Sequence, residues 1–181
     1  MNVCAIIPAG GQGTRMGGTV PKQFQALKGK PVLHYTLRTL QESDLIDSLV
    51  LVVPEKELVN ARADWLNRPP VVKQVVVGGE KRQDSVFNGY QVLPKNTDIV
   101  LVHDGVRPFL SKEMIQETLE VADKFGAAIT AIPVNDTLKQ VNNSGTVLRT
   151  VEREGLWRVQ TPQAFRFDLL GEAFLKAQAD S

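Results

Sequence analysis

The chain has 181 residues, of which 43% are hydrophobic and 23% are charged, and its formal net charge is +1. This length predicts a single domain with one substantial core. A near-neutral charge gives no extended field for nucleic acid or a membrane surface, so local cations must hold any anionic ligand. The single cysteine, Cys4, excludes a disulfide within the chain. No apolar run reaches about 18 residues and no signal-peptide pattern is present, so we expect a cytoplasmic protein that binds neither membranes nor nucleic acid.

Strand-like apolar runs alternate with segments of helical period along most of the chain. In chain order, the pattern predicts strand 3–7, helix 27–41, strand 48–53, helix 55–66, strand 71–77, helix 82–93, strand 98–102, helix 112–125, strand 127–132 and helix 167–178. Such alternation, with unbroken aliphatic strands, predicts an α/β, Rossmann-like fold with a mostly parallel sheet and helices on both faces. Ligands in such folds bind at the carboxyl ends of the strands.

Residues 135–157 depart from this alternation. Two short runs, 137–141 and 146–151, flank the sequence Asn142-Asn-Ser-Gly145, which is typical of a β-hairpin with a four-residue turn. The hairpin carries too few large apolar residues to form its own core, and isolated hairpins are only marginally stable in water. We therefore expect a protruding arm that packs on a second subunit, which makes the protein a homodimer.

A glycine-rich stretch follows the first strand. Its glycines permit left-handed torsions and let a ligand approach the main chain closely, and their exposed N–H groups can form a concavity for an anion. Arg15 and Lys22 add two cations to this stretch. Together these features predict a loop that wraps a triphosphate, formed by Pro8, Ala9, Gly10, Gly11, Gly13, Arg15 and Lys22.

The spacing of the glycines excludes two better-known phosphate-binding loops. After Gly11 and Gly13, the third glycine of the dinucleotide fingerprint would fall on Met16. Gly13 and Gly18 fit the P-loop pattern, but Thr19 stands where that pattern requires lysine. The loop is therefore arranged for a different nucleotide chemistry. The alternative is a mobile glycine-rich loop with two solvated cations.

A second motif, Gly78-Gly79-Glu80-Lys81-Arg82-Gln83-Asp84-Ser85, follows the strand at 71–77. A tight glycine turn at a strand end can read the edge of a nucleobase with main-chain groups. Ser85 lies one turn inside the next helix and can add a hydrogen bond. A simple helix start with an acidic residue near its N-terminus explains Glu80 and Ser85 equally well.

A third motif, His103-Asp104-Gly105-Val106-Arg107-Pro108, follows the strand at 98–102. Asp104 suits Mg²⁺, which prefers one or two carboxylates together with substrate phosphates. Arg107 suits a phosphate or a diol of a second substrate. His103 is expected to be a structural hydrogen-bonding residue, since no Gly-x-Ser-x-Gly element that would supply a nucleophile occurs in the chain.

The run Gly-x-Gly-x-Arg-Met followed by Pro-Lys-Gln resembles the signature of sugar-phosphate nucleotidyltransferases, and within them the 2-C-methyl-D-erythritol 4-phosphate cytidylyltransferase family. The motif at 103–108 and Gln-Thr-Pro-Gln at 160–163 match the same family, and the resemblance covers essentially the whole chain. It implies transfer of CMP from CTP to 2-C-methyl-D-erythritol 4-phosphate in the non-mevalonate isoprenoid pathway, with Mg²⁺ or another divalent cation. Ribitol 5-phosphate or another polyol phosphate is the alternative acceptor.

The resemblance also implies roles for individual residues. Arg15 and Lys22 would stabilise the transition state, and Asp104 would bind both nucleotide and metal. The remaining nucleotide-binding positions would be Pro8, Ala9, Gly10, Gly11, Gly13, Gly79, Glu80 and Ser85. The acceptor would be positioned by Arg107, Thr137, Thr161 and Arg153, the last reaching from the neighbouring subunit. The chain departs from the family's usual residues at Glu80, Val106 and Glu152.

Members of the resembled family usually continue beyond the position of Ser181. Their additional segment includes a Thr-Asp-Glu sequence, a strand, an Asn-Ile-Lys-x-Thr sequence and a last helix, and its lysine helps to orient the acceptor phosphate. We therefore expect either a fragment or truncated gene product, or an incomplete catalytic apparatus. A nucleotide-binding chain without activity is a further alternative.

Overall fold

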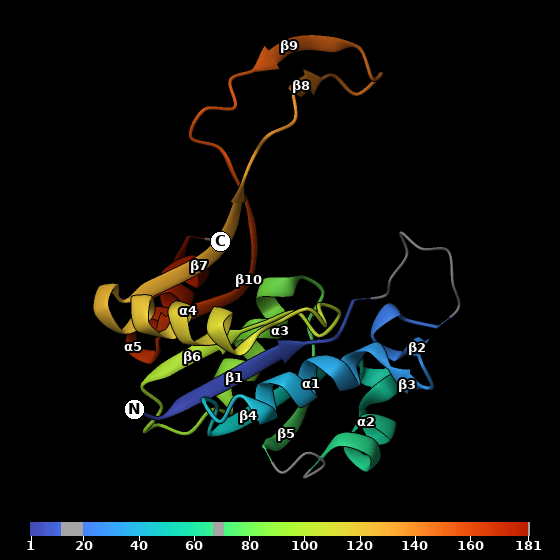
Figure 1. The fold of residues 1–181 in the computed structure, drawn as a ribbon, viewed down its shortest axis with the longest axis vertical. Helices are drawn as coiled ribbons and strands as arrows, with labels where there is room; N and C mark the ends of the chain where they lie inside the picture. The colour runs from blue at the N-terminus through green and yellow to red at the C-terminus, as the bar shows by residue number, and fades with distance from the viewer. Residues whose placement is uncertain (12–19, 67–70, 181) are drawn as a thin grey trace.

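The computed structural model describes residues 1–11, 20–66 and 71–180, and its centre is a six-stranded sheet (Figure 1). The strands lie in the order β5 (Val72–Val77), β4 (Ser48–Val53), β1 (Val3–Pro8), β6 (Ile99–Val102), β10 (Trp157–Arg166) and β7 (Ala127–Pro133). The first four run parallel, whereas β10 is antiparallel to both of its neighbours. The sheet is therefore mostly parallel, as predicted.

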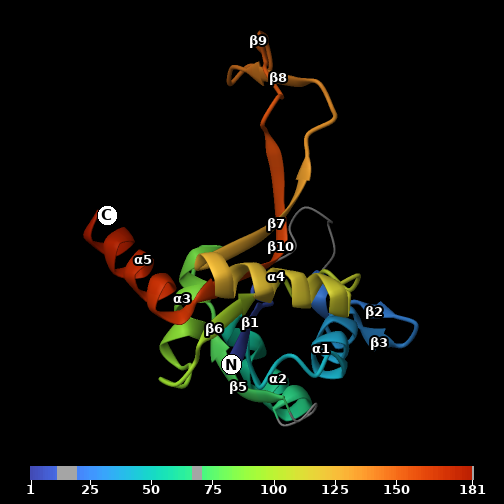
Figure 2. The ribbon, with the colours of Figure 1, turned by 60° about the vertical axis from the view of Figure 1, so that its left-hand side comes forward.

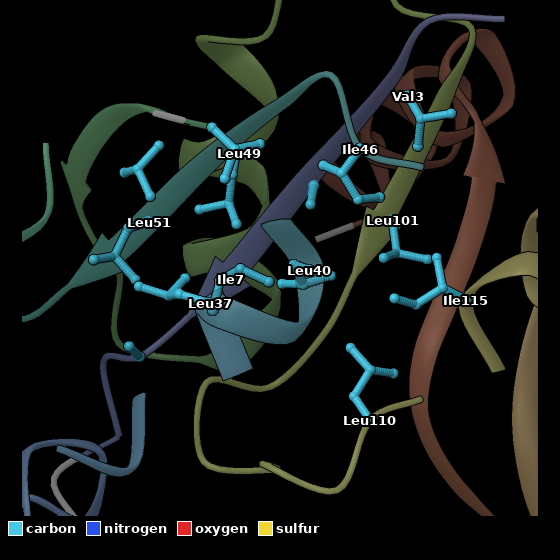
Figure 3. Packing of buried hydrophobic residues seen from close by; sticks show 14 of the residues in the cluster. Val3, Ile7, Leu37, Leu40, Ile46, Leu49, Leu51, Leu101, Leu110 and Ile115 are labelled. Carbon is cyan, nitrogen blue, oxygen red and sulfur yellow. The ribbon is translucent and has the colours of Figure 1, made fainter. Parts of the chain in front are cut away.

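Helices cover both faces of the sheet because the buried strands are apolar on both sides. Side chains alternate along β1, so that Val3, Ala5 and Ile7 enter one core cluster while Cys4 and Ile6 enter the other. The first cluster lies under α1 (Val32–Glu42), α2 (Leu58–Trp65) and α4 (Lys112–Phe125), and the second under α3 (Arg82–Gln91) and α5 (Phe167–Ala179). Figure 3 shows the first cluster, to which β1, β4, α1, β6 and α4 contribute. This confirms the predicted α/β class.

The packing of α1 shows how the helical period builds this core. Leu33, Leu37 and Leu40 recur at the spacing of one helix face, and all three are fully buried. Burial of each of these leucine side chains stabilises the fold by about 1.5–3 kcal/mol. The helix begins at Val32, after Pro31, and not at residue 27 as predicted.

The helix starts later because residues 26–31 form a separate small hairpin. Its strands are β2 (Ala26–Leu27) and β3 (Lys30–Pro31), and the turn between them holds Lys28 and Gly29 at φ 48° and 78°.

The predicted bounds of the second helix were closer to the structure. A 3-10 turn, η3 (Glu55–Glu57), leads into α2 within the predicted range 55–66.

Strand β10 was not predicted from the sequence. Its middle reads Gln160-Thr-Pro-Gln163, and a proline among polar residues removes the apolar run by which a central strand is recognised. The pairing with β7 shifts register between Val159 and Gln163, which takes this segment out of the regular ladder. After that shift, β10 pairs with β6 from Gln163 to Arg166.

The predicted hairpin is present. Strands β8 (Leu138–Val141) and β9 (Val147–Val151) pair antiparallel, and the turn is closed by Asn142, whose Oδ1 accepts the N–H groups of Ser144 and Thr146 at 3.1 and 2.9 Å. Figures 1 and 2 both show the hairpin held away from the body of the molecule at the far end of β7 and β10. Its exposed apolar side chains include Val141, Val147 and Leu148.

Within the described residues, no helix has both the length and the apolar composition needed to cross a membrane.

Candidate active site

A cavity of about 500 Å³ opens at the carboxyl ends of three parallel strands, β1, β5 and β6. The three motifs that follow these strands in the sequence all contribute to its walls, in agreement with the expectation that a ligand binds at the carboxyl ends of the strands. The lining residues come from the segments 8–11, 22–23, 79–82 and 104–106, together with Ser85. The predicted positions Gly13 and Arg15 lie outside the described residues.

A buried glutamine, Gln23, holds the described part of the glycine-rich loop by hydrogen bonds to its main chain. Gln23 lies in the 3-10 turn η2 (Lys22–Phe24) and is 2% exposed. Its Nε2 donates to the main-chain carbonyls of Ala9 and Gly11. Ala9 is tied to the sheet as well, since its N–H donates to the carbonyl of Val52 at 2.7 Å. The same turn places Lys22 in the cavity wall. Sequence reasoning missed Gln23, although its position directly after Lys22 was the available signal.

The turn that begins at Gly79 requires glycine for a steric reason. A Cβ at Gly79 would lie 2.3 Å from the Cβ of Asp84, and one at Gly78 would lie 2.8 Å from the Oγ of Ser85. The Ser85 hydroxyl accepts the N–H of Gly79 at 3.1 Å and donates to the carbonyl of Lys81 at 3.3 Å. Ser85 therefore stabilises the glycine turn through its hydroxyl. The sequence predicted that this side chain adds a hydrogen bond next to that turn.

Asp104 lies between two arginines at the edge of the cavity. Its Oδ1 is 3.0 Å from Nε of Arg82, and its Oδ2 is 3.0 Å from Nε of Arg107. Its main-chain N–H donates to the Oγ1 of Thr161 at 3.3 Å. The structure thus brings together Asp104, Arg107 and Thr161, all predicted as site residues. Arg82 was missed, because the sequence does not show that the start of α3 meets the end of β6.

His103 supports this turn from inside the core. It is 1% exposed, and its Nε2 lies 3.0 Å from the carbonyl of Arg107. Since a carbonyl only accepts, Nε2 carries the proton and Nδ1 is the unprotonated ring nitrogen; Nδ1 is buried with no hydrogen-bond partner among the described residues. Burial lowers the pKa of His103 below its usual value. A neutral imidazole that holds the turn matches the structural role expected for this residue.

The described cavity wall carries two carboxylates, those of Asp104 and Glu80, of which Asp104 is the predicted metal ligand. Among the described residues no three side chains of histidine, cysteine, aspartate or glutamate gather in a way that could hold a metal. Mg²⁺ is commonly held by one or two carboxylates with substrate phosphates and water completing its shell. Asp104 fits that mode and does not fit a site built by the protein alone.

Two predicted acceptor contacts lie on the arm. Thr137 precedes β8 and Arg153 follows β9, and the Arg153 guanidinium donates to the carbonyl of Asn135. The described residues that line the cavity include neither of them. One chain by itself therefore does not bring Thr137 and Arg153 to the other site residues.

The comparisons with known proteins agree on one family. The family model described as "IspD: 2-C-methyl-D-erythritol 4-phosphate cytidylyltransferase" matches residues 3–181. The chain is 42% identical to the protein of that name from Syntrophus aciditrophicus (strain SB) over 181 residues, which cover 98% of this chain and 77% of the relative. It is 44% identical to the one from Pelotomaculum thermopropionicum over 178 residues, with coverages of 97% and 75%.

Solved structures show the same likeness. The 4-diphosphocytidyl-2C-methyl-D-erythritol synthase from Anaerococcus prevotii DSM 20548 superposes with a TM-score of 0.82 at 32% identity, over 98% of this chain and 77% of that one. The 2-C-methyl-D-erythritol 4-phosphate cytidylyltransferase from Thermus thermophilus gives a TM-score of 0.74 at 31% identity, over 99% and 78%. The chain belongs to the 2-C-methyl-D-erythritol 4-phosphate cytidylyltransferase family.

Proposed function

We propose that the chain transfers CMP from CTP to 2-C-methyl-D-erythritol 4-phosphate, giving 4-diphosphocytidyl-2-C-methyl-D-erythritol and pyrophosphate. The observation that supports this most directly is the meeting of the glycine-rich loop, the Gly79 turn and Asp104 around one cavity, in a chain of this family. Lys22 and Lys81 in its wall provide positive charge that a triphosphate requires.

In this reaction an oxygen of the acceptor phosphate attacks the α-phosphorus of CTP. The bond between the α-phosphorus and the bridging oxygen breaks, and its electron pair leaves with pyrophosphate. The protein has no covalent step to perform, so its work is to align the two anions and to neutralise charge that grows on the transferring group. We assign that neutralisation to Lys22 and Arg15, together with main-chain N–H groups at Gly10 and Gly11.

We assign the nucleotide to the described cavity wall. Pro8 and Ala9 carry the chain from β1 into the glycine-rich loop, and the turn with Gly79, Glu80 and Ser85 forms the adjoining part of the wall, where a Cβ at Gly10 would lie 3.8 Å from Oγ of Ser85. Because Glu80 is in a turn shaped by main-chain and Ser85 contacts, we expect its role in recognising cytosine to come from its main chain.

We assign the acceptor to the side of the cavity where Arg107 and Thr161 meet Asp104. Thr137 and Arg153 would complete this part of the site from the arm of a second chain, because the arm stands away from the body of the molecule (Figure 2) and neither residue is among the described residues that line the cavity. The proposed homodimer is supported by the exposed apolar side chains of the arm and of the strand that leaves it, namely Val141, Val147, Leu148, Leu156, Trp157 and Val159.

Asp104 would hold Mg²⁺ or another divalent cation together with the phosphates of CTP. When bound there, the cation would supply charge neutralisation on the triphosphate and its leaving group. Each oxygen of Asp104 accepts one arginine N–H and keeps lone-pair capacity for such a cation. We place the reaction in isoprenoid precursor synthesis in the cytoplasm.

The test is pyrophosphate release by this chain with CTP, Mg²⁺ and 2-C-methyl-D-erythritol 4-phosphate, compared with ribitol 5-phosphate under the same conditions. We expect release with the first acceptor, and a loss on the order of 100–1,000-fold for Lys22→Ala, since Lys22 lies in the cavity wall. Release with ribitol 5-phosphate alone would keep the chemistry and overturn the acceptor. Binding of CTP without release from either acceptor would overturn the proposed activity of this chain.

A further inference from the structure

The carboxylate of Asp104 is bonded by two arginines, one at each of its oxygens. Arg82, the first residue of α3, bonds one oxygen, and Arg107, in the turn after β6, bonds the other; both use Nε at 3.0 Å. Neither arginine takes the carboxylate in the bidentate fork that arginine and carboxylate often form. Each guanidinium therefore keeps its Nη atoms for a second partner.

The second partners both lie on β10. Nη1 and Nη2 of Arg82 are each 3.4 Å from Oε1 of Gln163, and Nη1 of Arg107 donates to Oε1 of Gln160. Thr161, between the two glutamines, accepts the N–H of Asp104. The segment 160–163 is thus attached at three points to the edge of the nucleotide cavity.

The stability that these ion pairs add is too small to account for the arrangement. The side chains of Arg82 and Arg107 are 46% and 43% exposed, and that of Asp104 is 22% exposed. Ion pairs this open to water typically contribute about 0–1 kcal/mol. The cluster instead fixes the orientation of the Asp104 carboxylate relative to β10. A planar guanidinium bonded at Nε and at Nη sets the angle between its two partners.

We propose that Arg82 is a positioning residue for the transfer reaction, which acts by holding one oxygen of Asp104 so that Arg107 can bond only the other. This inference rests on the proposed function, in which Asp104 and Arg107 meet the substrates. Without Arg82, the Asp104 carboxylate can turn and give both oxygens to Arg107 as a bidentate pair. In that bidentate pair, the Asp104 carboxylate would no longer face the nucleotide. Arg107 would at the same time no longer face the acceptor.

The experiment is a double-mutant cycle between Arg82 and Asp104. Arg82→Gln should lower kcat/KM on the order of 100-fold, the cost of a misplacement of about 1 Å in a reacting site. In an Asp104→Asn background the same change should cost about twofold or less, because no carboxylate remains to be oriented. Arg82→Lys should fall between wild type and Arg82→Gln, since it keeps the charge and loses the fork.

A matched control removes an arginine–carboxylate pair elsewhere on the surface. Arg38→Gln breaks the exposed pair between Arg38 and Glu42 on α1 and should leave kcat/KM and both KM values unchanged. For Arg82→Gln, the KM for the acceptor should rise along with the fall in kcat, whereas a general loss of folded protein would lower kcat alone.

The inference is overturned if Arg82→Gln stays near wild type, or if it costs as much with Asn at position 104 as with Asp. These outcomes differ from a failure of the proposed function, which is the lack of pyrophosphate release by the wild-type chain with 2-C-methyl-D-erythritol 4-phosphate. In that case the same cycle is measured on the calorimetric affinity for CTP, because Arg82 and Asp104 both line the nucleotide cavity. Non-additive losses of CTP affinity are then expected, and additive losses contradict the inference.

Discussion

The side-chain amide of Gln23 donates to the main-chain carbonyl of Ala9 and so joins the two ends of the glycine-rich loop. The same Nε2 lies 3.2 Å from the carbonyl of Gly11. The start of the loop and the turn that carries Lys22 are thereby held in one arrangement. The side chain next to the proposed catalytic cation thus helps to set the shape of the phosphate-binding wall.

This contact predicts a large effect of a small chemical change. Gln23→Glu keeps the shape of the side chain but turns two buried N–H donors into a carboxylate that faces two carbonyl oxygens. We expect a loss of about 1–3 kcal/mol in the free energy of unfolding, the cost of leaving buried polar groups without partners, and weaker binding of CTP. Urea unfolding and calorimetry with CTP would measure both. The control is Gln41→Glu on the exposed side of α1, which should change neither.

Gly89 in α3 predicts a case in which packing outweighs helix propensity. Alanine is better than glycine inside a helix by about 1 kcal/mol. A Cβ at position 89, however, would lie 2.6 Å from Cγ2 of Ile6 and 3.3 Å from Cγ2 of Val52. We expect Gly89→Ala to destabilise the fold by about 1–3 kcal/mol, the usual cost of overpacking. Gln91→Ala, at an exposed position of the same helix, should stay within about 0.5 kcal/mol of wild type. Equal stability of the two variants in urea would contradict the close contact of α3 with β1.

The pKa of His103 predicts how stability depends on pH. Burial lowers this pKa below 6.5, so the folded chain resists a proton that the unfolded chain accepts. Above pH 6.5, His103 is neutral in both states and does not change the free energy of unfolding with pH. As the pH falls below that value, the unfolded chain takes up the proton first, and the free energy of unfolding decreases. His103→Asn should flatten the fall in stability between neutral pH and the pH range below 6. His34→Asn is the comparison, since His34 also has a lowered pKa but is only partly buried. An unchanged slope for His103→Asn would show that His103 is not the group responsible.

The proposed sharing of a site between two chains predicts rescue by mixing. Lys22→Ala inactivates the cavity wall of its own chain, and Arg153→Ala inactivates the arm that would serve the other chain. A mixed dimer would contain one intact pair, so equal mixing with random exchange should restore about a quarter of wild-type turnover. Pyrophosphate release before and after mixing measures this. Arms that act within their own chain would give no rescue.

The sequence predicted the parts of the fold that depend on local pattern. Buried strands such as β1 and β4 are continuous apolar runs, and α4 has the bounds of its amphipathic period, 112–125. Helix α4 also carries its own end signals: Ser111 accepts the N–H of Met114, and Gly126 takes φ 92° after the last turn. Such features lie within a few residues of one another, which is why periodicity and capping rules find them.

What the sequence did not predict depends on contacts between distant segments. Gln163 meets Arg82 across 81 positions, and nothing in the local sequence of either residue marks the other. β10 was missed for a related reason, since its polar residues are explained by partners around Asp104 and not by its own strand pattern. The three site motifs were found because each carries glycine and charge at a strand end. Their mutual hydrogen bonds become visible only in the fold.

The place of β10 in the sheet also constrains the order in which the protein can fold. In the described sheet, β7 pairs only with β10, and β10 comes after the entire arm in the chain. The four parallel strands can associate as soon as residue 102 is available, but β7 then has no neighbour until residues 157–166 arrive to fill the gap beside β6. During synthesis on the ribosome, we therefore expect a long-lived intermediate with an open edge at β6. Because Gln160 and Gln163 of β10 bond Arg107 and Arg82, these two arginines should take their positions beside Asp104 only after β10 has joined.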